Sequence, residues 1–277
     1  MNKLINLDFK RFFKDKLFLV VCILAVGFAV LTPFLYVIIF GNMEDLDPIT
    51  KEMLAGYVTA KGQFFSAFSF GNNLGLIAPL LIGIILFKDF SFGTIRNKII
   101  AGYSRPSIFL SNFTVCFITT FGIVLAHAFL TLGICLFFFD YQTTPFTSSD
   151  FWYFWESLLF QMLVYMFVSA FVSYLCTTKK NMGIMIVLYI AVVFGCSMIA
   201  GVLQIVLITI GTQPDMKTTV EILEFVQRIN VFNSSATIGL GISYKLEDVC
   251  YYVIPPIVGT VGLLGFGAWR FSKIDLK

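Results

Sequence analysis

The stretch LFLVVCILAVGFAVLTPFLYVIIF, residues 17–40, decides the class of fold. It contains no charged residue, and it exceeds the roughly 20 apolar residues that an α-helix needs to cross a bilayer. It is too long for the apolar core of a signal peptide, and no small-residue cleavage site follows it. We therefore expect this segment to be a membrane span.

The composition of the whole chain agrees with that expectation. Of its 277 residues, 58% are hydrophobic and only 13% are charged, whereas soluble domains carry about 25% charged residues. No polar stretch is long enough to enclose a water-soluble core. The six cysteines lie in or beside apolar runs, without the spacing of metal sites or disulfide frameworks, and read as buried thiols. We expect an all-α integral membrane protein that forms one transmembrane domain over residues 1–277.

Apolar windows along the chain predict six spans, at residues 17–40, 68–87, 108–139, 157–177, 182–211 and 249–269. The second span is the least sharply bounded, because its continuous apolar run covers only residues 74–87. We extend it back to Phe68, which places Asn72 and Asn73 in or near the membrane. Since six is an even number, both chain ends are expected on the same side.

The distribution of basic residues assigns that side. If both termini are cytoplasmic, every Lys and Arg faces the cytoplasm except Lys51, Lys61, Lys217, Arg228 and Lys245. Cytoplasmic loops carry the excess of Lys and Arg in membrane proteins. We expect a multi-pass plasma-membrane protein with cytoplasmic termini.

A basic island, KDFSFGTIRNKIIAGYSRPS at residues 88–107, lies between the second and third expected spans. Its apolar residues recur at nearly helical spacing and its polar residues fall elsewhere around the axis, which predicts a short amphipathic helix that stops at Gly102. One interpretation is a basic loop that only satisfies the charge rule. The other is a docking surface for another protein, which the aromatic side chains of Phe90 and Phe92 favour.

The run FKDFSFGTIRNKIIAGYSRPSIFLS and the chain end GFGAWRFSKIDL resemble the permease subunits of the type-2 exporter superfamily of ABC transporters. The pairs Gly93-Thr94 and Ser104-Arg105 stand at the positions of that family's motif. Family members often carry Glu just before the Gly-Thr pair, where this chain has Ser91 and Phe92. Within the family, the likeness is greatest to permeases that export peptides or confer self-immunity to bacitracin and lantibiotics.

The resemblance implies that residues 88–104 are a coupling helix that docks on a separate ATP-binding subunit. It implies two copies of that ATPase, a second permease of the same or a sister chain, and export of an amphipathic peptide, antibiotic or lipid-like substrate. This chain has no G-x-x-x-x-G-K-[ST] phosphate loop, so it cannot hold ATP in that way itself. We therefore expect a transport subunit that is not an enzyme and has no cofactor of its own, with ATP and Mg bound by the partner. The expected docking residues are Phe90, Phe92, Gly93, Thr94, Arg96, Lys98 and Arg105.

The N-terminal segment also has an amphipathic pattern. Apolar residues gather on one helical face and basic residues cover the remainder: Ile5, Phe9, Phe12 and Phe13 against Lys3, Lys10, Arg11 and Lys14. This pattern is typical of a helix that lies in the membrane interface and is attracted to anionic lipid. Nucleic acid is not an expected partner, because the basic residues follow the membrane boundary.

Few polar residues fall within the spans, and those few leave alternatives open. His127 could donate or accept a structural hydrogen bond, or could relay protons in an ion-gradient-driven transporter or channel. Glu156 is expected at the outer interface, although a carboxylate near an outer mouth could also attract a cationic peptide. Gln161 and Gln204 are expected to join helices. A non-transporting sensor or scaffold that uses the 88–104 helix is a third possibility. No Ser-His-Asp pattern or metal-ligand spacing supports an enzyme.

Two outer loops are long, residues 41–67 and 212–248. The second contains an apolar stripe formed by Ile222, Leu223, Val226 and Ile229. That stripe predicts a short helix, which either re-enters the membrane above a pore or caps the structure by packing on another subunit.

Overall fold

The structure is a computed structural model that describes residues 2–40, 59–138, 147–179, 181–210, 216–239 and 246–274. All regular elements in these residues are helices, and six of them are long and apolar enough to span a membrane. These six are α2 (Lys16–Phe40), α5 (Asn73–Ser91), α7 (Arg105–Phe138), α8 (Ser148–Thr178), α9 (Met182–Ile210) and α12 (Leu246–Lys273). The expected all-α, six-span membrane protein is confirmed.

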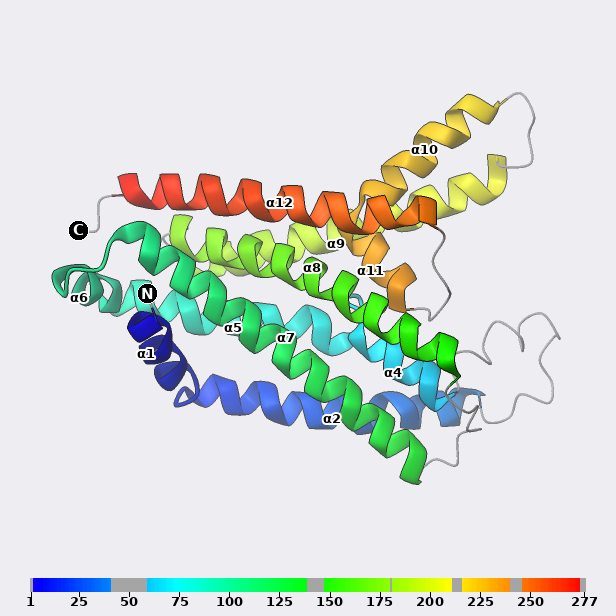
Figure 1. Ribbon diagram of the computed structural model, residues 1–277, viewed down its shortest axis with the longest axis horizontal. Helices are drawn as coiled ribbons and strands as arrows, with labels where there is room; N and C mark the ends of the chain where they lie inside the picture. The colour runs from blue at the N-terminus through cyan, green and yellow to red at the C-terminus, as the bar shows by residue number, and fades with distance from the viewer. Residues whose placement is uncertain are drawn as a thin grey trace.

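Five shorter helices lie at the two ends of the bundle. They are α1 (Asn2–Phe12), α4 (Ala60–Phe68), α6 (Thr94–Ile100), α10 (Lys217–Ile229) and α11 (Val231–Gly239). Figure 1 shows the start of α1, the end of α12 and the whole of α6 at one end of the bundle, with α4, α10 and α11 towards the other. This arrangement fits an even number of crossings.

The expected spans agree with the helices, with two corrections at the end of the bundle where α4 lies. The second span does not reach back to Phe68: the helix begins at Asn73, and residues 69–72 form a break between α4 and α5. The fourth span begins at Ser148 instead of residue 157, because Thr147 and Asp150 form a capping box that starts α8 earlier. Residues 139 and 211, at the ends of the third and fifth expected spans, lie outside the described residues.

Helices α5, α7 and α8 form the core, and glycine allows two of them to approach closely. A Cβ atom added to Gly83 of α5 would lie 2.6 Å from Cγ1 of Val172 of α8. In the next turns towards the outer end, a Cβ on Gly75 would meet the hydroxyl of the fully buried Tyr165, also at 2.6 Å. Small residues at these positions bring the helix backbones together, which is how membrane helices gain packing contacts.

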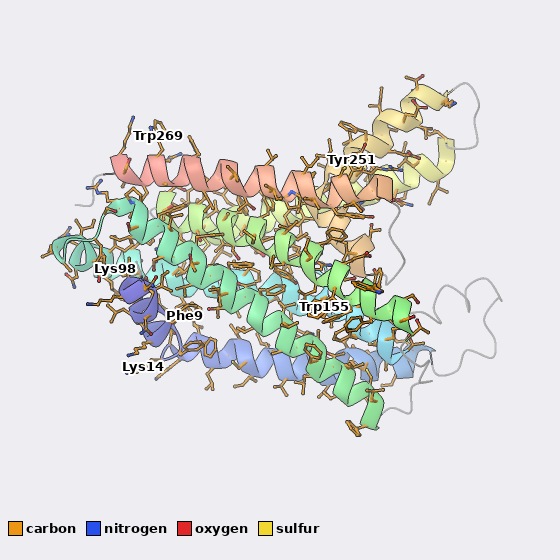
Figure 2. All side chains as sticks on the ribbon, viewed as in Figure 1. Phe9, Lys14, Lys98, Trp155, Tyr251 and Trp269 are labelled. Carbon is orange, nitrogen blue, oxygen red and sulfur yellow. The ribbon has the colours of Figure 1, made fainter. Side chains whose placement is uncertain are left out.

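The tryptophans mark the two ends of the membrane-spanning bundle. Trp152 and Trp155 lie near the start of α8, and Trp269 lies near the end of α12, with exposed fractions of 68%, 50% and 53%. Figure 2 shows Trp155 and Trp269 towards opposite ends. Tryptophan is enriched at both membrane–water interfaces, so this placement agrees with a bundle that crosses a bilayer.

The 212–248 loop contains two helices of opposite character. α10 carries the expected apolar stripe, yet none of its residues is buried, and Figure 1 shows it projecting from the bundle beside the end of α9. α11 was not expected, and it is largely buried. Its Ser235 accepts a hydrogen bond from the Phe70 amide at 2.8 Å and donates to the Gln161 side chain at 2.8 Å. α11 therefore joins α8 to the break before α5.

Candidate docking site and membrane cavity

Two left-handed glycines delimit α6. Gly93 precedes the helix with φ of 70°, and Gly102 follows it with φ of 89°. A side chain is strained in this backbone conformation, whereas glycine adopts it freely. The island therefore turns sharply out of α5, forms two turns of helix and turns back into α7, and the expected stop at Gly102 is confirmed.

One face of α6 packs on the bundle and another faces outward. Ile95 is 2% exposed and belongs to an apolar cluster with Leu4, Ile108, Phe109 and Phe271. By contrast, Phe92 and Ile100 are each 77% exposed, and Arg96 is also exposed. Exposed side chains thus stand at Phe92, just before the Gly93 turn, at Arg96 within α6, and at Ile100, its last residue. We call these three residues the docking face.

Three of the seven expected docking residues instead contact the rest of the protein. The Phe90 ring lies 5.8 Å from the Phe271 ring, edge to face. Arg105 donates to the carbonyl oxygens of Ser272 and Ile274, at 2.8 and 2.7 Å, and so caps the end of α12. Lys98 is the third such residue. Of the remaining four, Phe92 and Arg96 face outward, Gly93 forms the turn, and Thr94 begins the helix half-buried.

Lys98 lies at the centre of an ion-pair cluster that joins α6 to α1 and α5. Its Nζ is 2.7 Å from Oδ1 of Asp8 and 3.4 Å from Oδ2 of Asp89, and Arg11 also pairs with Asp89. The Ser111 hydroxyl of α7 donates to Asp8 at 2.7 Å. We call Asp8, Arg11, Asp89 and Lys98 the charge clasp.

The clasp is largely removed from solvent. The side chains of Lys98, Asp8 and Asp89 are 10%, 7% and 5% exposed. This burial lowers the pKa of Lys98, while the nearby Asp8 carboxylate opposes the shift. A buried charge is stable only while it is paired, and the residues that pair with one another here come from α1, α5, α6 and α7. The clasp therefore joins these four helices at one end of the bundle.

A second ion pair holds the turn between α1 and α2. Lys88 of α5 donates to both carboxylate oxygens of Asp15, at 2.9 and 2.8 Å. Burial works to raise the pKa of Asp15, but hydrogen bonds from Lys88 and the Leu17 amide outweigh it and hold the pKa below its usual range. Sequence reasoning missed Asp8 and Asp15. Asp8 could have been noticed because it is an acidic residue beside the apolar face of an otherwise basic helix, a position that suggests a buried ion pair.

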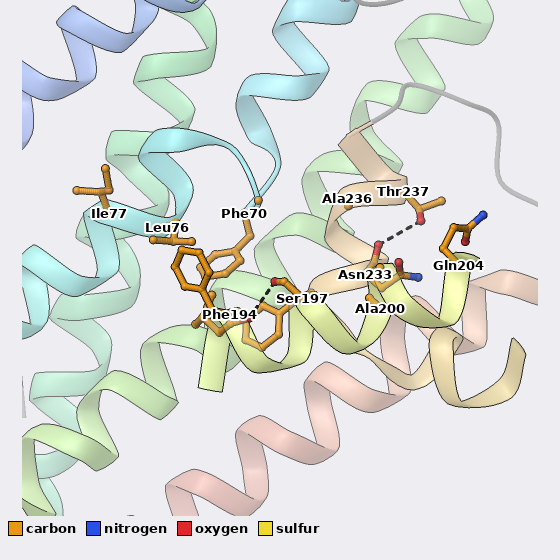
Figure 3. A pocket seen from close by; sticks show the side chains of 14 residues that line it. Phe70, Leu76, Ile77, Phe194, Ser197, Ala200, Gln204, Asn233, Ala236 and Thr237 are labelled. Atoms are coloured by element: carbon orange, nitrogen blue, oxygen red, sulfur yellow. Dashed lines mark hydrogen bonds between the residues drawn. The ribbon is translucent and has the colours of Figure 1, made fainter. Parts of the chain in front are cut away.

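A large cavity lies between α5, α9 and α11. Its volume is about 890 Å³, within the 300–1,000 Å³ range of ligand pockets. Figure 3 shows Leu76 and Ile77 of α5 on one side, with Phe194 and Ala200 of α9 and Ala236 of α11 around the remainder. The walls are mainly apolar.

The polar groups in the cavity wall already have partners in the protein. The Ser197 hydroxyl donates to the Val193 carbonyl, and the Thr237 hydroxyl donates to the Asn233 carbonyl. Gln204 accepts from Gln227 of α10, so the expected interhelical role of Gln204 is present. The cavity therefore suits a ligand that buries apolar surface.

The other polar residues of the spans have structural surroundings. His127 is 4% exposed, and its Nδ1 lies 2.9 Å from the carbonyl oxygen of Ala25 in α2. Gln161 is fully buried and bonds Ser235 through both ends of its amide. Glu156 is exposed in the early turns of α8.

Replacement of His127 by Phe is expected to lower the free energy of unfolding by about 1 kcal/mol, because one net intramolecular hydrogen bond is lost. Under the alternative that His127 relays protons, the same variant would instead abolish proton-dependent flux across vesicles that contain the purified protein. Denaturant unfolding and flux measurements at several pH values check the two expectations. Unchanged stability together with a loss of proton-dependent flux would favour the relay.

No protein-family model and no curated protein sequence matches this chain. The function is therefore argued from two features of the molecule: an outward-facing basic and aromatic helix at one end, and an apolar cavity among the spans. Both are connected by α5, whose first turns line the cavity and whose last residue, Ser91, leads into the α6 turn.

Proposed function

We propose that this chain is the permease subunit of an ATP-driven ABC exporter of the type-2 superfamily. Its α6 is the coupling helix that docks on a separate ATPase. The observation that carries the proposal is the docking face: the large apolar side chains of Phe92 and Ile100 are each 77% exposed, and Arg96, midway between them in the sequence, is exposed as well. Exposed aromatic and Arg side chains are the residues that most often anchor protein interfaces.

The attachments of α6 support a role in transmitting force. Lys98 ties α6 to α1 and α5, Ile95 packs on α7 and α12, and Arg105 holds the end of α12. A helix with these attachments cannot move without its neighbours. Displacement of α6 by ATP-driven closure of the ATPase would pass along α5 to the cavity wall at Leu76 and Ile77.

The cavity supports an amphipathic or lipid-like cargo. Its apolar wall and its partnered polar groups favour a molecule that buries hydrocarbon over a small ion. The open cavity would be completed by a second permease subunit, either a second copy or a sister chain. The exporter would then contain two permeases and two ATPases.

The distribution of charge supports an orientation. The α1 and α6 end of the bundle carries most of the Lys and Arg residues, and such residues are in excess on the cytoplasmic side of membrane proteins. We therefore propose that this end and both termini lie in the cytoplasm and that the protein lies in the plasma membrane. An ATPase can reach α6 only on that side.

The tagged chain, extracted from its native membrane in mild detergent, is expected to copurify with an ATPase, and Arg96→Glu is expected to lose it. The variant reverses a charge at the centre of the docking face and should remain folded because Arg96 is exposed. Lys3→Glu, an exposed charge reversal on α1, is the matched control. Retention of the ATPase by Arg96→Glu, or equal loss from the control, would contradict the assignment.

A further inference from the structure

We propose that the groove between α1 and α6 binds an anionic phospholipid of the cytoplasmic leaflet, with its phosphate on Lys10 and Lys14. The proposal goes beyond ATPase docking and rests on the proposed function only for the orientation of the chain. It assigns α1 a ligand in addition to its attachment to the bundle.

The groove has an apolar floor and a basic edge. Its volume is about 490 Å³. Its apolar lining comes from Leu4 and Leu7 of α1 and from Ala101 and Tyr103 beyond α6. The polar and charged residues that complete the lining are Asp8, Lys10, Arg11, Lys14, Thr94, Asn97 and Lys98. An inorganic anion has no apolar atoms that could bury the apolar lining of the groove. The glycerol and upper acyl carbons of a phospholipid would cover that lining.

The acidic residues of this region are already engaged. Asp8 is held by Lys98 and Ser111, and Asp15 is held by Lys88. The outward charge of α1 is consequently basic, and Figure 2 shows Lys14 projecting away from the bundle while Lys98 lies at the junction with α6. This arrangement is complementary to a phosphate.

The surroundings place the groove at the level of lipid headgroups. Leu7 and Phe13 are 57% and 55% exposed, and the Phe13 ring packs on Phe9 and Phe18 with centroids 6.0 and 4.9 Å away. A helix with exposed apolar side chains beside lysines at the start of a span lies in the membrane interface. The docking face residues do not line the groove, so a lipid there leaves them accessible.

Native mass spectrometry of the purified full chain tests the site. With phosphatidylglycerol and phosphatidylcholine offered in equal amounts, the wild type should retain phosphatidylglycerol selectively. The double variant Lys10→Gln/Lys14→Gln should bind it about 30-fold more weakly, which corresponds to about 1 kcal/mol for each lysine near an anionic surface. Lys3→Gln removes a basic residue of α1 that does not line the groove, and it should bind as the wild type does.

Three results would overturn the proposal. If Lys3→Gln weakened phosphatidylglycerol binding as much as the double variant does, the lipid would be attracted to basic charge in general and not to the groove. If the wild type bound phosphatidylglycerol and phosphatidylcholine equally, the groove would not be a site for anionic lipid. Equally tight binding of soluble glycerol phosphate would assign the groove to a free phosphate. Because no ATPase is present in this experiment, failure of the lipid site is distinguishable from failure of the docking assignment.

Discussion

Lys98→Ala is expected to lower the free energy of unfolding by about 3–5 kcal/mol, the usual cost of leaving a buried carboxylate without its partner. Asp8 keeps a hydrogen bond from Ser111 and Asp89 keeps Arg11, but neither carboxylate can be rehydrated while it is 7% or less exposed. The charge clasp then opens, and α1 is expected to detach from α6.

Denaturant unfolding of the detergent-purified protein measures this effect. Lys10→Ala, which removes an exposed lysine from the same helix, should change stability by less than about 0.5 kcal/mol. Removal of both charges in Asp8→Asn/Lys98→Met should cost less than Lys98→Ala alone, because fewer unpaired charges remain buried. If Lys98→Ala lowered the free energy of unfolding as little as Lys10→Ala does, the clasp would not stabilise this end of the bundle.

Gly201→Trp is expected to reduce export to background while the ATPase still copurifies. Gly201 lines the cavity on α9, and a Cβ added there meets no atom within 4 Å, so the indole can occupy the cavity without disturbing the helix. Transport of an amphipathic substrate into inverted vesicles would measure the effect.

Gly195→Trp provides the matched control. Gly195 lies on the same helix, also has open space around an added Cβ, and does not line the cavity. Export should persist in this variant. Equal export by the two variants would show that the substrate does not pass through the cavity.

The spans and the position of α6 could be predicted because they depend on local pattern. The apolar run at residues 17–40 lies within α2, and the two glycines around Thr94–Ile100 delimit α6. Helical spacing also separated an apolar from a polar side of the island. It could not tell which side the bundle covers, because that depends on α1 and α12, far away in sequence. Lys98 was therefore expected to face outward and is found in the clasp.

The break before α5 and the buried helix α11 could not be predicted for a related reason. Residues 69–72 interrupt the span that was expected to begin at Phe68, and α11 lies in a stretch that was expected to be part of an outer loop. Both are stabilised by Ser235, which bonds Phe70 and Gln161 from segments more than 70 residues away. Hydropathy averages over neighbouring residues and does not detect such contacts. The cavity, which α11 helps to line, was missed together with it.

The account rests on α6 as the docking helix, and photo-crosslinking tests it most directly. A photoreactive phenylalanine analogue placed at Phe92 in the full chain, in native membranes, should crosslink to a protein with a nucleotide-binding phosphate loop. The same analogue at Phe137, an 84% exposed position near the opposite end of α7, should not. An ATPase crosslinked only from Phe92 is the predicted result. Crosslinks from Phe92 to lipid alone, or to the same proteins as Phe137, would contradict the docking of α6 on an ATPase.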